Sequence, residues 1–126
     1  MIYGLERLKA YPKQEPLLIT EGPSDCWTAL TLGFHAIAIP SATLFDSHCR
    51  PLLEGRNLHI FPDQDVAGFN LYFELKKSFP QLQYHQLPDG CKDLSEYYLQ
   101  IRQHGMSLEE ARNSFIKEVG SKSITI

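Results

Sequence analysis

The chain has 126 residues, of which 43% are hydrophobic and 21% are charged, and its 15 acidic and 12 basic side chains give a formal net charge of −3. This length suits one domain with a single core. The slight net acidity argues against a protein that holds nucleic acid by bulk positive charge, but it is compatible with a local acidic site that acts on phosphates through bound cations.

Membrane and disulfide-rich classes are disfavoured as well. No apolar run approaches the roughly 20 residues of a membrane span, and the N-terminus lacks the apolar segment of a signal peptide. Cys26, Cys49 and Cys91 are widely spaced and form no C-x-x-C pair, which argues against a structural zinc site or a disulfide framework. We therefore expect a cytoplasmic protein without membrane contact.

Short apolar runs alternate along the chain with longer amphipathic stretches. Pro23 suits the first turn of a helix and Gly33 its end, whereas Pro51 weakens the helical pattern around it. Ser107 and Glu110 form a capping box. In chain order, the sequence predicts a strand at 17–20, a helix at 23–32, a strand at 36–39, a helix at 43–54, a strand at 58–61, a helix at 65–79, a strand at 82–87, and helices at 93–104 and 107–119.

This alternation predicts an α/β fold with a mostly parallel four-stranded central sheet flanked by helices, the last strand lying nearer an edge. Ligands of such sheets bind beyond the carboxyl ends of the strands. Glu21 follows the first strand, Asp63 and Asp65 follow the third, and Lys92 and Asp93 follow the fourth. Segments far apart in the sequence are therefore expected to bring carboxylates to one rim.

Asp63 and Asp65 are spaced by one residue and can point to the same side. Mg²⁺ takes oxygen ligands, usually one or two carboxylates together with waters and substrate phosphates. Gly68 follows in the predicted helix, where a small residue lets a ligand or another backbone come close. The alternative is that Asp63 is only a turn residue and Asp65 only a helix N-cap.

Glu21 directly follows a buried strand, where desolvation can raise its pKa and suit it to general acid–base work. Asp25 lies in the next helical turn, where the helix dipole favours negative charge, so taken alone it is a capping or supporting residue. Several carboxylates at one rim repel each other. A bound cation is the physical reason that would justify the whole set.

The segment after the fourth strand adds a cation to this rim. Asp93 can cap the following helix, and Lys92 can meet a phosphate as a point charge. The alternative for Lys92 is an ordinary solvated lysine, and Glu96 is most simply a solvated acid of the first helical turn.

The order ITEGPSD, IFPDQDVAG, LPDGCKDLSE resembles the Toprim domain of bacterial-type primases, phage primase–helicases, topoisomerases and several nucleases. The resemblance runs from Leu17 to Tyr98. Its E-G-x-x-D and D-x-D-x-x-G motifs are weak singly but specific when they occur in order on the right elements. The third motif looks most like the primase and primase–helicase branch, although Ser95 stands where that branch usually has Asn.

The resemblance implies a Toprim (Rossmann-like) domain over residues 1–126, with a core at 17–98 and a C-terminal helical extension at 107–119. It implies catalytic roles for Glu21, as acid–base group or metal ligand, and for Lys92, facing a phosphate. It further implies Mg²⁺ or Mn²⁺ held by Asp63 and Asp65. The remaining implied residues are the supporting acids Asp25 and Asp93 and the structural glycines Gly22 and Gly68.

The implied activity is Mg²⁺-dependent nucleotidyl transfer in DNA replication primer synthesis, by a primase-type enzyme that binds DNA template, primer and nucleoside triphosphates. The zinc-binding and template-gripping segments usual in such primases are not found, nor is a helicase P-loop. We therefore expect an excised core that works with other domains of a parent primase or helicase, or a stand-alone small Toprim protein. A Toprim nuclease and a non-catalytic nucleic-acid-binding module remain as alternatives.

The aromatic residues also allow both a functional and a structural interpretation. Tyr84, Tyr97 and Tyr98 could stack on bases, but a structural role is the preferred interpretation for any single aromatic residue. Phe69, Tyr72 and Phe73 lie at helical spacing and are expected in the core.

Overall fold

The computed structural model describes residues 4–40, 50–63, 65–85, 87 and 91–120. Its strands are β1 (Leu17–Thr20), β2 (His35–Ala38), β3 (Leu58–Ile60) and β4 (Gln83–Tyr84). Its helices are the 3-10 helix η1 (Leu5–Ala10) and the α-helices α1 (Pro23–Thr31), α2 (Arg50–Leu53), α3 (Val66–Ser78), α4 (Leu94–Gln103) and α5 (Leu108–Gly120).

The four strands form one sheet in the order β2-β1-β3-β4, and every neighbouring pair is parallel. The chain passes from β1 through α1 to β2 on one side, and from β3 through α3 to β4 on the other. The strand order therefore reverses between β1 and β3, which is the topological switch point where open α/β sheets bind their ligands.

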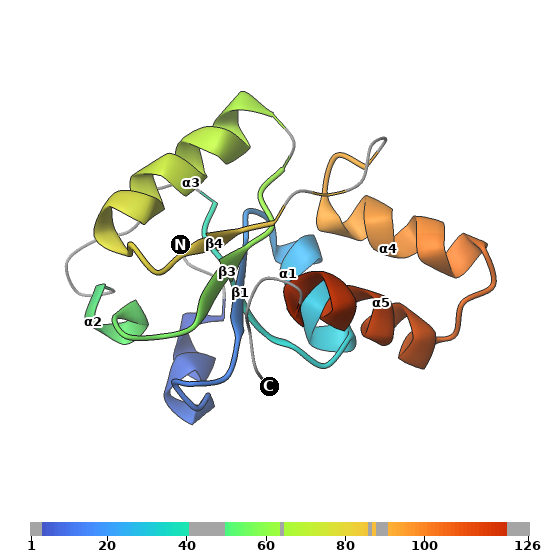
Figure 1. Cartoon of the computed structure of the whole chain (residues 1–126), viewed down its shortest axis with the longest axis horizontal. Helices are drawn as coiled ribbons and strands as arrows, with labels where there is room; N and C mark the ends of the chain where they lie inside the picture. Colours follow the sequence, from blue (N-terminus) through green and yellow to red (C-terminus); the bar gives the residue numbers. More distant parts are fainter. Residues whose placement is uncertain (1–3, 41–49, 64, 86, 88–90, 121–126) are drawn as a thin grey trace.

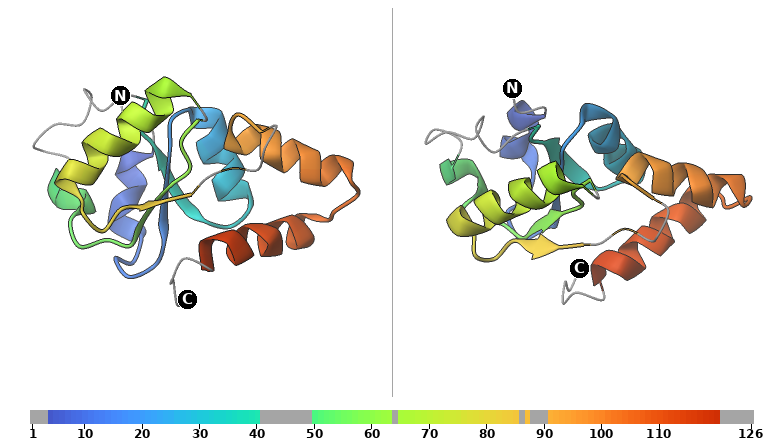
Figure 2. Two further views of the ribbon diagram at one scale, coloured as in Figure 1. Left: turned by 45° about the horizontal axis from the view of Figure 1, so that its top comes forward. Right: turned by 90° about the horizontal axis from the view of Figure 1, so that it is seen from above.

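Helices cover both faces of the sheet. In Figure 1, α1, α4 and α5 lie on one side of the strands, whereas α2, α3 and η1 lie on the other. Figure 2 keeps the same two groups apart when the molecule is turned. The α/β fold with a parallel sheet between two helical layers is thus confirmed.

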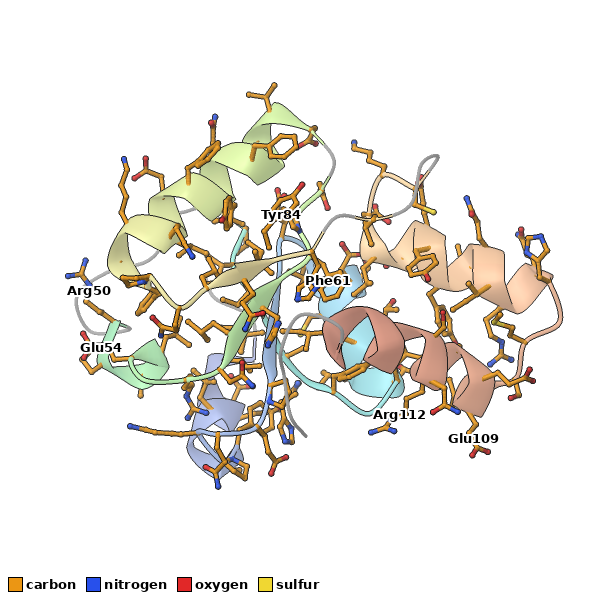
Figure 3. All side chains as sticks on the ribbon, in the orientation of Figure 1. Arg50, Glu54, Phe61, Tyr84, Glu109 and Arg112 are labelled. Carbon is orange, nitrogen blue, oxygen red and sulfur yellow. The ribbon has the colours of Figure 1, made fainter. Side chains whose placement is uncertain are left out.

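Two apolar clusters result, one on each face. Alternate residues of β1 divide between them, because Leu18 packs with the α1, α4 and α5 side while Leu17 and Ile19 pack with the η1, α2 and α3 side. Phe61, directly after β3, belongs to the first cluster and lies between the sheet and the α4–α5 pair in Figure 3. Burial on both faces explains why the strands appear as continuous apolar runs.

Most predicted elements are confirmed, with differences at their ends. The fourth strand lies at the sheet edge as expected, but it is only the two residues Gln83–Tyr84 instead of 82–87. The helix expected at 43–54 is present as Arg50–Leu53, and residues 41–49 lie outside the described part. The 3-10 helix η1 has no counterpart among the predicted elements, because it is short and lacks the period of a longer amphipathic helix.

Helix α5 begins as its sequence predicts. The Ser107 hydroxyl accepts a hydrogen bond from the Glu110 N–H at 3.1 Å, and the Glu110 carboxylate accepts one from the Ser107 N–H at 3.2 Å. This reciprocal pair is the predicted capping box. Across the described residues, the helices are all too short or too polar to cross a membrane.

Candidate metal centre

Glu21 and Asp63 meet at the switch point between the two central strands. Glu21 directly follows β1, and its Oε1 accepts a hydrogen bond from the backbone N–H of Asp63 at 2.9 Å. The Phe61 N–H donates to the Ile19 carbonyl at 3.1 Å just before this point, which continues the parallel ladder of β1 and β3. The sheet register therefore fixes the Glu21 side chain against the loop that carries Asp63.

The pKa of Glu21 is raised above its ordinary value. Desolvation by burial is the largest cause, and the negative charges of Asp65 and Asp25 add to it. The Asp63 N–H and the Lys92 ammonium act in the opposite direction and lower the pKa. The predicted effect of desolvation on this carboxyl is confirmed, and a raised pKa suits a carboxyl to general acid–base work.

Three carboxylates from separate segments converge beside Glu21. Asp25 comes from the first turn of α1, Asp63 from the loop after β3, and Asp93 from the start of α4. One oxygen of each lies within 4.8 Å of the others. Oxygen atoms this close are arranged as ligands of one hard divalent cation would be. The expected convergence of distant acids on one rim is confirmed for this group, which we call the acidic triad.

Asp25 is the most deeply placed member of the acidic triad, with 3% of its surface exposed. Its Oδ1 accepts hydrogen bonds from the Ser95 backbone N–H at 3.0 Å and from the Ser95 hydroxyl at 2.5 Å. Burial nevertheless raises the pKa of Asp25, and the charge of Asp93 adds to the rise. The sequence does not predict that Ser95 anchors Asp25, because it shows only that Ser95 stands where the primase branch usually has Asn.

Asp63 is the member whose charge is least compensated. Its Oδ1 is buried and has no hydrogen-bond partner. Burial, together with the smaller effects of the charges of Glu21, Asp25, Asp93 and Asp65, raises the pKa of Asp63 to about 7. A buried acceptor without a donor is costly. A divalent cation supplies what this oxygen lacks, so the residues present fit such an ion.

Asp65 and Lys92 lie at the outer side of the rim. Asp65 is the N-cap of α3, since its Oδ1 accepts a hydrogen bond from the Gly68 N–H at 2.8 Å. Its other oxygen, Oδ2, lies 4.0 Å from the Lys92 ammonium nitrogen. The capping role is therefore present, and the second oxygen is left to face the lysine. Direct ligation by Asp65 or Glu21, which the family resemblance implies, stays a prediction.

Helix α4 presents its first turn to the same rim. Asp93 is its N-cap, and Asp93 Oδ1 accepts a hydrogen bond from the Glu96 N–H at 2.9 Å, as expected. The Glu96 carboxylate accepts one from the Lys92 N–H at 2.7 Å. Glu96 is thus more than a solvated acid, because it holds the backbone on which Lys92 is carried. Residues 88–90 of the third motif lie outside the described part.

Gly68 is required by the packing of the site. A Cβ at this position would lie 2.0 Å from the Asp63 carbonyl oxygen and 2.7 Å from Glu21 Oε1. The expected close approach of backbone to Gly68 is confirmed. Gly22 differs, because a Cβ there would meet only the Ser24 hydroxyl, at 4.0 Å. It caps α1 without a side chain, and its predicted structural role has no steric basis here.

Comparison with known proteins supports the assignment of the fold. A family model described as Toprim-like matches residues 18–98, more than half of the chain. Among solved structures, the chain is similar to a small TOPRIM domain protein from Bacillus stearothermophilus, with 18% sequence identity, a TM-score of 0.55, and coverage of 72% of this chain and 85% of that one. At this identity the likeness concerns the fold alone. Comparison with curated proteins gave no match.

Proposed function

Since this chain belongs to the Toprim-like family, we propose that it is a divalent-cation-dependent catalytic core for nucleotidyl transfer of the DNA-primase type. Toprim domains bind divalent metal ions and occur in enzymes that act on nucleic acids. The proposed substrates are a DNA template, a primer and nucleoside triphosphates, with Mg²⁺ or Mn²⁺ as the cofactor. Other domains of a primase or helicase would supply the template grip.

The observation that carries the proposal is the unpartnered Oδ1 of Asp63 inside the acidic triad. Without a cation, three carboxylates and the neighbouring Glu21 share one poorly solvated rim, and desolvation together with their repulsion raises the pKa of Asp63 to about 7. The chain keeps this arrangement at a cost in stability. A cation held by Asp25, Asp63 and Asp93 would remove the repulsion between these carboxylates, and the free energy released would favour cation binding.

The side chains around the acidic triad divide the remaining work. A bound divalent cation would neutralise phosphate charge and favour a nucleophilic hydroxyl. Glu21, whose raised pKa suits proton transfer, accepts or returns the proton of the attacking group. Lys92 is 62% exposed and lies 4.0 Å from Asp65, so its ammonium group is available to a phosphate that arrives at the rim.

The third motif favours primer synthesis over strand cleavage as the reaction of this chain. The segment from Cys91 to Glu96 resembles the primase branch, and it supplies Lys92, Asp93 and the Asp25 anchor Ser95. Hydrolysis would use the same carboxylates with water as the attacking group. A nuclease is therefore the alternative that the same geometry serves, and a non-catalytic binding module would keep the carboxylates without the reaction.

The metal assignment is tested by calorimetric titration of Mn²⁺ into the chain and into Asp63→Asn. We expect binding in the unchanged chain and a loss of at least about tenfold in the variant. Glu109→Gln is the matched control, because Glu109 is an exposed acid on the outer side of α5, away from the rim (Figure 3). Equal binding by Asp63→Asn would overturn the metal centre.

The reaction is tested with a single-stranded template, nucleoside triphosphates and Mn²⁺, alongside an end-labelled DNA that reports cutting. Primer products that disappear in Glu21→Gln support the proposal. Cut fragments without primers would favour the nuclease. Metal binding with neither product, in the chain and in a parent protein that contains it, would favour the binding module.

A further inference from the structure

A hollow of about 320 Å³ lies between α1 and α4, next to the acidic triad. One wall is a stripe of α1 at helical spacing, formed by Ser24, Trp27, Thr28 and Thr31. The other wall is the matching stripe of α4, formed by Ser95, Tyr98 and Leu99. The two helices lie side by side in both views of Figure 2. We call this hollow the α1–α4 groove.

The α1–α4 groove is continuous with the acidic triad through hydrogen bonds. The Thr28 and Ser95 hydroxyls lie 3.2 Å apart. Ser95 in turn donates its hydroxyl to Asp25 Oδ1 at 2.5 Å. A molecule bound at the acidic triad therefore borders the groove, with only the Ser95 side chain between the two.

The lining of the groove selects a neutral, flat occupant. It joins two aromatic side chains to five hydroxyls, one of them the phenol of Tyr98, and carries no charged side chain. Trp27 is 62% exposed, which is unusual for the largest apolar side chain. A phosphate has no cation to pair with inside the groove, whereas a nucleobase can stack on an indole and hydrogen-bond to hydroxyls. Arg102, at 6.0 Å over the Tyr98 ring, provides positive charge beside it.

We propose that the α1–α4 groove binds an unpaired nucleobase of a single strand, stacked on Trp27, whose neighbouring phosphate lies at the acidic triad. This inference rests on the proposed function and deepens it, because it assigns the place in the fold at which one base of the bound strand is held. The size of the groove agrees, because about 320 Å³ lies at the lower end of the range of small-molecule pockets and suits one base.

Trp27 is the one tryptophan of the chain, so its fluorescence reports the groove directly. We expect a short oligo(dT) to quench this fluorescence, and the quenching to saturate together with binding measured by anisotropy of an end-labelled strand. Trp27→Ala should lower the affinity for oligo(dT) about tenfold, and Trp27→Phe by less, because a stacking ring remains. Phe73→Ala is the matched control, since Phe73 is an aromatic residue of similar exposure (57%) on α3, which covers the other face.

Calorimetry with Mn²⁺ separates this inference from the metal centre. Trp27→Ala should bind Mn²⁺ like the unchanged chain, because Trp27 lies outside the acidic triad. Oligo(dT) binding without quenching, or with equal affinity in Trp27→Ala and Phe73→Ala, would overturn the groove while leaving the metal centre intact. A shift of the Trp27 emission with protein concentration, without any response to oligo(dT), would also overturn it and would assign the groove to contact between copies of the chain.

Discussion

Gly68 and Asp63 are packed so closely that a methyl group at position 68 would lie 2.0 Å from the Asp63 carbonyl oxygen. The first turn of α3 therefore rests directly on the loop that carries the central carboxylate. The same missing side chain leaves room for Glu21 Oε1, which a Cβ would approach to 2.7 Å. Glycine has a low helix propensity, but at position 68 it permits the close packing that positions Asp63 and Glu21.

Gly68→Ala is expected to displace the Asp63 loop and to destabilise the chain by about 1–3 kcal/mol, the usual cost of overpacking. It should also weaken Mn²⁺ binding, because Asp63 and Glu21 both move. Urea unfolding and calorimetry measure the two effects. Gly22→Ala is the control, since a Cβ there meets only an atom at 4.0 Å. Equal stability of the two variants would contradict the steric role of Gly68.

The pKa of Asp63 links metal-free stability and cation binding to pH. Since folding raises this pKa from 3.8 to about 7, the folded chain holds more protons than the unfolded chain between these values. The contribution of Asp63 to stability is therefore present at low pH and is lost as the pH rises toward 7. Mn²⁺ affinity should rise over the same range, because the ion must displace a proton.

Thermal unfolding from pH 4 to 8, with and without Mn²⁺, measures this linkage. Asp63→Asn should be more stable than the unchanged chain at pH 8 without metal, since it removes a charge that has no partner. It should also lose the stabilisation by Mn²⁺. A metal-free chain that is equally stable with Asp or Asn at position 63 would show that the repulsion in the acidic triad is negligible.

Ser95→Ala is expected to remove the Ser95 hydroxyl from the donors to the Asp25 carboxylate and to leave the backbone N–H groups. Loss of a hydrogen bond to a buried charged group costs about 1–3 kcal/mol. Since hydrogen bonds from Ser95 lower the pKa of Asp25, the variant should raise that pKa and shift Mn²⁺ binding to higher pH. Calorimetry at pH 6 and pH 8 detects the shift. Thr28→Val, which removes the neighbouring hydroxyl but leaves Asp25 bonded, should show none.

A buried histidine pair gives a second, opposite pH effect. His59 Nδ1, on β3, lies 2.7 Å from Nε2 of His85, which directly follows β4, and the His59 Nε2 lies 2.8 Å from Asn57 Oδ1. Burial, with the second ring beside it, lowers the pKa of His59 to about 3. Its contribution to stability is therefore present above pH 6.5 and is lost as the pH falls toward 3.

Comparison of Asp63→Asn with Asp63→Asn/His59→Gln isolates this effect, because the first change removes the opposing slope of Asp63. The single variant should lose stability between pH 6.5 and pH 4, and the double variant should lose less. Urea midpoints across this range are the measurement. Parallel curves for the two proteins would show that His59 is not buried in its neutral form.

The sequence predicts the sheet well because its strands are buried on both faces. Continuous runs such as Leu17–Thr20, ended by glycine and proline, leave little choice of secondary structure. The carboxylates of the rim follow from the same pattern, since Glu21 and Asp63 each come just after a central strand. Which oxygens meet could not be predicted, because the grouping of Asp25 with Asp63 and Asp93 depends on how α1 and α4 pack.

The aromatic residues of α3 show the limit of periodicity. Phe69 and Phe73 were expected in the core, yet they are 41% and 57% exposed, and the helix buries Leu71 and Leu75 instead. The physical reason is the shortness of β4, a two-residue edge strand that cannot cover a wider stripe of α3. Phe69 stacks on Tyr84 at this edge, with 6.0 Å between ring centroids. Hydropathy spacing alone carries no information on strand length.

The acidic triad takes one carboxylate from each of three segments that are far apart in the sequence: the start of α1, the loop after β3 and the start of α4. No single hairpin or βαβ unit contains it, so it forms only when the parallel sheet is complete and α4 has docked. Such long-range assembly is slow compared with local helix formation. Cation binding would therefore report completed folding, and a chain truncated before α4 would lose its response to metal even where its first strands still pair.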